Sequence, residues 1–148
     1  MPGRAPALKE APPALPKEIE TLNMIDEPGG PAKVSSILAE ARRKDPKATL
    51  FPEDIVNFMG YEHLRSGDTK GAVEILKLNT EAYPNSANVY DSISDAYLAA
   101  GQKDLARLNA KKALELLPND TSIKDERRRA GIRDSAEQKL KQLGDRSQ

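Results

Sequence analysis

The chain has 148 residues, of which 23 are basic and 23 acidic, so its formal net charge at neutral pH is zero. A chain without net charge has no strong field to steer it toward nucleic acid or an anionic membrane, and we expect neither as a partner. Hydrophobic residues make up 38% of the chain but aromatic residues only 4%, which favours a helical core of Ala, Leu and Ile.

The absence of cysteine excludes disulfides, a thiol nucleophile and a cysteine-based metal site. The longest apolar runs are only a few residues, too short for a transmembrane helix or for the apolar segment of a signal peptide. We therefore expect no membrane insertion. The expected location is cytoplasmic, or periplasmic or secreted if the chain is a fragment of a larger protein.

Residues 1–31 are rich in residues that interrupt regular structure. They hold seven of the eleven prolines and three of the nine glycines, which predicts a Pro-rich flexible linker or tail. Within this range, residues 17–25 could form a short helical or extended segment that packs Ile19, Leu22 and Ile25 against the repeats. Nine residues are marginal as an isolated helix.

Residues 32–48 predict a degenerate upstream helix. Their apolar residues follow the i, i+3, i+4, i+7 spacing of one helix face: Val34, Ile37, Leu38 and Ala41. The helix should run from about 32 to 44 and stop near Asp45, because Pro46 disfavours helical backbone at the residue before it.

The stretch 53–120 matches itself at an offset of 34 residues. Seven positions are identical in the two copies: Leu64 with Leu98, Gly67 with Gly101, Ala72 with Ala106, Lys77 with Lys111, Glu81 with Glu115, Pro84 with Pro118 and Asn85 with Asn119. This period predicts two helix-turn-helix units, 53–86 and 87–120, each of which must stack on a neighbour to bury its apolar face.

Each unit should contain two helices, at 53–65 and 69–82 and then at 87–100 and 103–117, with a glycine in the turn between them. The inward face of the first helix is expected to hold Ile55, Val56, Met59, His63 and Leu64. Residues 121–143 keep an apolar stripe, with Lys139 among the polar residues beside it, and predict a capping helix that Gly131 breaks or kinks. Residues 144–148 should fray.

These residues resemble the tetratricopeptide repeat family, whose units carry a small residue and an aromatic on the first helix, alanines on the second and a proline after it. The matching residues are Gly60, Gly67, Ala72 and Pro84, and then Tyr90, Ser94, Tyr97, Gly101, Ala106, Ala113 and Pro118. The first unit departs from the pattern at Val56, His63 and Asn79. The resemblance implies an all-α fold, a short right-handed superhelix of antiparallel helix pairs with a C-terminal capping helix.

A narrower set of residues is similar to the repeat tails appended to bacterial secreted or periplasmic serine hydrolases and esterases. It comprises 58–61, 78–79, 83–88, 90–92 and 95–98. These residues contain no nucleophile elbow or other hydrolase motif. The similarity therefore implies an accessory tail without the catalytic activity.

In this family the first helices of successive units line a concave groove that binds a peptide or an extended segment. Helical spacing assigns eight residues to that surface: Asp54, Asn57, Tyr61, Arg65, Asn88, Asp91, Asp95 and Leu98. Carboxylates stand where relatives that grip an acidic chaperone tail need cations, so we expect a basic or neutral protein or peptide. An equally open alternative is that these residues only face water.

Other candidate residues favour structural roles. His63, the only histidine, lies on the inward stripe and is expected to be a core or rim residue without metal ligands at helical spacing. The basic cluster of Lys124, 127–129 and Arg133 is interrupted by carboxylates and has no aromatic neighbours, as expected of a solvated cap face. We expect no catalytic, cofactor-binding or metal site.

The sequence thus predicts a non-catalytic protein-protein interaction module that binds a peptide or partner domain on its concave face. Two alternatives remain. The chain could be an accessory tail associated with or split from a bacterial serine hydrolase or esterase. It could also be a self-associating structural repeat protein, because the apolar ends of a two-unit array can stack on a second copy and give a weak homo-oligomer.

Overall fold

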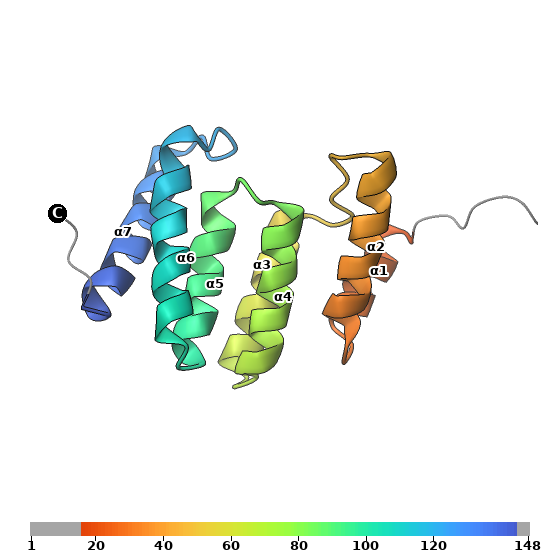
Figure 1. Cartoon of the computed structure of the whole chain (residues 1–148), viewed down its shortest axis with the longest axis horizontal. Coiled ribbons are helices and arrows are strands. Elements are labelled where there is room, and N and C mark those ends of the chain that lie inside the picture. The colour runs from red at the N-terminus through yellow and green to blue at the C-terminus, as the bar shows by residue number, and fades with distance from the viewer. Residues whose placement is uncertain (1–15, 145–148) are drawn as a thin grey trace, which may run out of the picture.

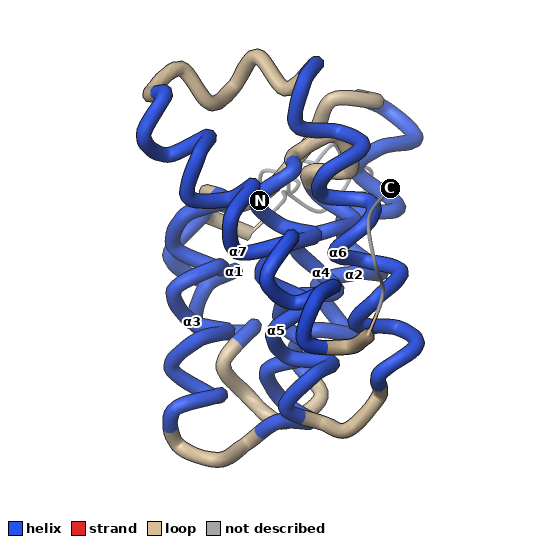
Figure 2. Tube along the Cα trace, turned by 90° about the vertical axis from the view of Figure 1, so that its left-hand side faces the viewer, coloured by secondary structure: helices blue, strands red, loops and turns tan. Residues whose placement is uncertain are grey.

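The computed structural model describes residues 16–144, and these residues form an all-helical protein. Between them they contain seven α-helices, one short 3₁₀ turn and no strand, which confirms the all-α prediction. The α-helices are α1 (Glu18–Ile25), α2 (Gly30–Lys44), α3 (Glu53–Arg65), α4 (Thr69–Ala82), α5 (Ala87–Ala99), α6 (Lys103–Leu116) and α7 (Glu126–Gln142). The pairs α1–α2, α3–α4 and α5–α6 and the helix α7 follow one another along the long axis in chain order (Figure 1), and loops join the helices (Figure 2).

The turns inside the pairs α3–α4 and α5–α6 are built in the same way. Gly67 and Gly101 both have positive φ angles, 88° and 77°, which glycine adopts without steric cost. Each glycine N–H donates to a carbonyl three residues earlier at 3.1 Å, Leu64 in one turn and Leu98 in the other. The residue after each glycine then donates to the carbonyl five residues before it at 2.9 Å. These bonds satisfy the carbonyls that a helix end leaves free.

The two helices of each pair also approach closely at matching positions. In the first pair, a Cβ added to Gly60 would lie 2.3 Å from the Leu76 side chain, so any larger residue would force Leu76 to move. In the second pair the matching residue, Ser94, donates its hydroxyl to the Ala106 carbonyl at 2.7 Å. Ala72 and Ala106 are completely buried. The 34-residue offset found in the sequence is therefore repeated in the contacts.

The upstream part is more ordered than the sequence indicates. The prediction of a flexible linker over 1–31 differs from the structure in its second half, because α1 lies there and α2 begins at Gly30; residues 1–15 lie outside the described part. Prolines permit this because Pro16 precedes α1, Pro28 lies between the helices and Pro31 occupies the first turn of α2. Ile25 is buried in a cluster with residues of α2, α3 and α4, while Ile19 is exposed.

Arg42 joins α2 to the first unit. Its guanidinium donates to the carbonyls of Glu81 and Ala82, at 2.6 and 2.7 Å, and to that of Ala48 at 3.0 Å. The first two carbonyls end α4, where no further turn supplies donors and the helix dipole favours a cation. The sequence identified α2 but not this contact.

The last helix, α7, runs without interruption through Gly131, contrary to the predicted break. Glycine at an exposed helix position lowers helix stability by about 1 kcal/mol relative to alanine, but it causes no clash. Ala136 and Leu140 pack against Ala110 and Ala113 of α6, and this burial holds α7 together. Of the predicted frayed tail only Gly144 belongs to the described residues.

Candidate functional site

The facing sides of α3 and α5 carry most of the residues that the sequence assigned to a binding surface. Two of them meet directly, because the Tyr61 hydroxyl donates a hydrogen bond to Asp95 Oδ2. Tyr61 and Asp95 occupy the same position in their respective units. Stacking of the units therefore places them against each other.

Lys139 of α7 completes this arrangement and lies where the sequence interpretation did not place it. Expected on a polar face, it is 4% exposed. Its Nζ lies 2.7 Å from Asp91 Oδ1 and 2.9 Å from Asp95 Oδ1, and it donates to the Asp91 carbonyl at 2.8 Å. We call Tyr61, Asp91, Asp95 and Lys139 the Lys139 network.

Burial dominates the electrostatics of this network. It raises the pKa of the Asp91 carboxyl above its usual value, while the Lys139 ammonium acts in the opposite direction. Burial, followed by the charge of Asp95, raises the pKa of the Tyr61 hydroxyl as well, so tyrosine is the donor to Asp95. Two of the three carboxylates that the sequence offered to a basic ligand, Asp91 and Asp95, are thus occupied by a cation of the same chain.

The other predicted surface residues remain accessible to different degrees. Asp54 is exposed and lies 3.4 Å from the Arg128 guanidinium. Arg65 is exposed, pairs with Glu62 and lies over the Phe58 ring, 6.0 Å from its centroid. Of the remaining three, two are half-buried asparagines and the third packs at the edge of the core: Asn57, Asn88 and Leu98.

Asn57 has one unusual feature. Its Oδ1 is buried and accepts no hydrogen bond from any described residue. A buried acceptor without a donor is uncommon in folded proteins, and because Oδ1 is shielded from solvent a ligand at the surface does not reach it.

His63 lies at the rim, as expected, but with partners that the sequence did not suggest. Nδ1 is 2.8 Å from Asp68 Oδ2 and Nε2 is 2.8 Å from Asp26 Oδ1, so both ring nitrogens face carboxylates. Only the imidazolium can donate from both nitrogens. Asp26 follows the last residue of α1 and Asp68 precedes α4, so the ring links three helices.

These contacts predict a titration shift at His63. The hydrogen bonds to Asp26 and then Asp68 raise the pKa of the imidazole above its ordinary value of 6.5. Because the folded-state pKa is the higher one, this contribution to stability is fully present below about pH 6.5 and is lost as the pH rises through the folded-state pKa. Proton NMR titration of the ring should show the raised pKa, and Asp26→Asn should lower it. An unchanged pKa in that variant would contradict the assignment.

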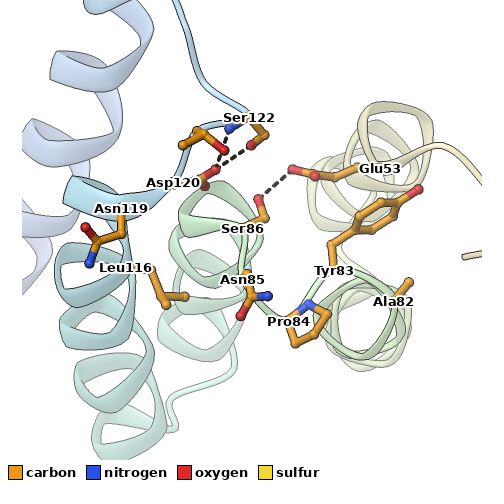
Figure 3. A pocket seen from close by; sticks show the side chains of 11 residues that line it. Glu53, Ala82, Tyr83, Pro84, Asn85, Ser86, Leu116, Asn119, Asp120 and Ser122 are labelled. Carbon is orange, nitrogen blue, oxygen red and sulfur yellow. Dashed lines mark hydrogen bonds between the residues drawn. The ribbon is translucent and has the colours of Figure 1, made fainter. Parts of the chain in front are cut away.

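A pocket of about 500 Å³ lies where the carboxyl ends of α4 and α6 approach each other, and Figure 3 shows its lining. On one side the Ser86 hydroxyl donates to Glu53 Oε2 at 2.8 Å. On the other the Ala87 N–H donates to Asp120 Oδ2, also at 2.8 Å. Both bonds connect the last residue of a unit to its first residue. Burial raises the pKa of the Glu53 carboxyl. The polar groups of this pocket are bonded to one another and hold the units together.

The basic cluster of α7 is partly used inside the fold. Arg129 donates to the carbonyls of Leu117, Asp120 and Ile123, which follow α6. Arg128 faces Asp54 of α3. Two of the three consecutive arginines therefore satisfy groups of the same chain.

Over residues 16–144 the structure contains no group of three or more His, Cys, Asp or Glu side chains that could hold a metal ion. None of the helices in that range combines the length and the apolar character needed to cross a membrane. Comparison of the sequence with protein-family models and with curated proteins gives no match.

Proposed function

We propose that this chain is a tetratricopeptide-type repeat protein that acts as a protein-interaction module without catalytic activity, binding a peptide or a partner domain on the exposed parts of α3 and α5. The observation that supports this is the repetition of contacts at 34 residues. The turns at Gly67 and Gly101 share the same hydrogen bonds, and Gly60 and Ser94 occupy matching close approaches. Units of this kind commonly present one helix of each pair to a ligand.

The structure narrows which residues would contact a partner. Asp91 is buried and Asp95 is held by Tyr61 and Lys139, so neither is free for a ligand. Asp54 and Arg65 are exposed, and Asn57 is half-buried. An extended peptide would meet the exposed side chains of Asp54 and Arg65 on this surface. A neutral segment fits these groups as well as a basic one.

Affinity purification from a cell lysate followed by mass spectrometry tests the proposal. The tagged chain should retain a reproducible set of proteins that Asp54→Ala combined with Arg65→Ala loses. Lys77→Ala, an exposed substitution on α4, serves as the matched control and should retain the same set as the parent chain. If the double variant and the parent retain identical proteins, the exposed part of α3 is not the binding surface.

A further inference from the structure

The outer side of α3 exposes a pair of large apolar residues. Ile55 is 43% exposed and Phe58 is 59% exposed, although the sequence interpretation placed Ile55 inward. A spacing of three residues puts both on the same side of the helix, and Glu62 and Arg65 continue that side. We call these four residues the α3 face.

The same position in the second unit is covered. Val89 and Ser92 stand 34 residues after Ile55 and Phe58, and they are only 1% and 2% exposed. Tyr61 of α3 donates to Asp95, which lies one helical turn after Ser92, so α3 is a helix that lies over this part of α5. This side of a unit can therefore pack against a helix. On α3 the corresponding residues, Ile55 and Phe58, remain exposed.

A second exposed apolar pair lies on α6. Leu105 is 39% exposed and Leu108 is 63% exposed, again three residues apart. Together with Lys112 and Glu115, which continue the same side of the helix, they form what we call the α6 face. Of the five large hydrophobic side chains that are exposed in residues 16–144, four belong to these two faces.

The two faces share one spacing and carry opposite charges. Counting from the first apolar residue, the second follows after three positions in both helices, and charged residues follow after seven and ten. At position seven α3 has Glu62 and α6 has Lys112. At position ten α3 has Arg65 and α6 has Glu115. Two helices laid side by side in the same direction would thus pair leucine with isoleucine or phenylalanine, and each charge with its opposite.

The charges of the chain itself permit this exchange. Glu62 and Arg65 form an ion pair within α3, and both side chains are more than half exposed. Such surface pairs contribute little to stability and are readily replaced by pairs with another molecule. The like charges that precede the faces, Asp54 and Asp104, are each paired with an arginine of their own chain.

We propose that the α3 face binds the α6 face of a second copy of this chain, with the two helices parallel and in register. Because two different surfaces meet, each copy keeps one unused face of each kind, and the assembly is an open head-to-tail chain of copies. Two short helix faces bury little area, so the association is weak, with a Kd of about 0.1–1 mM.

Sedimentation velocity over protein concentrations from about 20 µM to about 2 mM, which bracket that Kd, tests the proposal. The mean mass of the parent chain should rise with concentration, whereas Phe58→Asp and Leu108→Asp should each remain monomeric. Mixing these two variants should form dimers and nothing larger, because only one intact pair of faces is then available. Ile19→Asp, which introduces the same charge at an exposed isoleucine of α1, should associate like the parent.

Charge reversal tests the register independently. Glu62→Lys should raise the Kd about tenfold, and adding Lys112→Glu to it should restore association. All variants should keep the parent's circular dichroism and unfolding midpoint, since the altered side chains are exposed or, at Lys112, half-buried. A parent chain that stays monomeric throughout the concentration range would overturn the proposal. So would a mixture of Phe58→Asp and Leu108→Asp that fails to associate.

Discussion

Replacing Lys139 with methionine should lower the free energy of unfolding by about 3–5 kcal/mol, the usual loss when one partner of a buried ion pair is removed. Methionine preserves much of the side-chain volume but leaves Asp91 and Asp95 without their cation. Asp91 is buried, so water cannot replace the ammonium. Urea unfolding followed by circular dichroism at pH 7 measures the loss.

The pH dependence distinguishes this explanation from a packing defect. Without Lys139 the pKa of Asp91 in the folded state should rise further above its unfolded value. The folded state then binds more protons than the unfolded state. The stability of the variant therefore recovers as the pH falls toward the pKa of an ordinary carboxyl group. Lys141→Met on the exposed side of α7 is the control and should change stability little. A loss that is equal at pH 7 and pH 5 would contradict the electrostatic explanation.

Substituting Gly30 with alanine should cost about 3 kcal/mol, at the upper end of the range for overpacking. The added Cβ would lie 1.7 Å from the Met24 carbonyl oxygen, and a backbone atom cannot rotate away as a side chain can. The turn between α1 and α2 must therefore open, and α1 must move and withdraw Ile25 from the core. Urea unfolding measures the change in stability.

Two further measurements make this prediction specific. Asp26 leaves with α1, so the raised pKa of His63 should fall in the Gly30→Ala variant, as judged by NMR titration. Gly131→Ala is the matched control, because a Cβ at that position meets no atom within 4 Å. It should stabilise α7 by about 1 kcal/mol through better helix propensity. If both substitutions had the same effect, close packing of α1 on α2 would not be the cause.

The repeat was readable from the sequence because its signals are local. Gly67 and Gly101 end helices through their own backbone, and the spacing of Val34, Leu38 and Ala41 marks one side of α2 whatever the rest of the fold does. All the helices except α1 could be placed within a few residues for this reason. The break predicted at Gly131 was wrong because the low helix propensity of glycine is a weak effect compared with the burial of Ala136 and Leu140.

The binding surface could be predicted less well because its electrostatics depend on contacts between distant residues. Lys139 stands 48 residues from Asp91 and Asp26 stands 37 residues from His63, and no spacing rule connects them. One signal was present: Lys139 follows Ile132 by seven positions and Ala136 by three, which is the spacing of the apolar stripe itself. A lysine in such a position calls for a buried carboxylate partner.

The arginines at the two carboxyl ends have a consequence for where this protein can be divided. Arg42 of α2 supplies donors to the last carbonyls of α4, and Arg129 of α7 does the same after α6. Both side chains come from outside the pair of similar units. The boundaries of the sequence repeat are thus not the boundaries of a self-sufficient folding unit. A fragment cut at 53 and 120 would keep every repeated residue, yet the carboxyl ends of α4 and α6 would depend on water for donors that the flanking helices now provide.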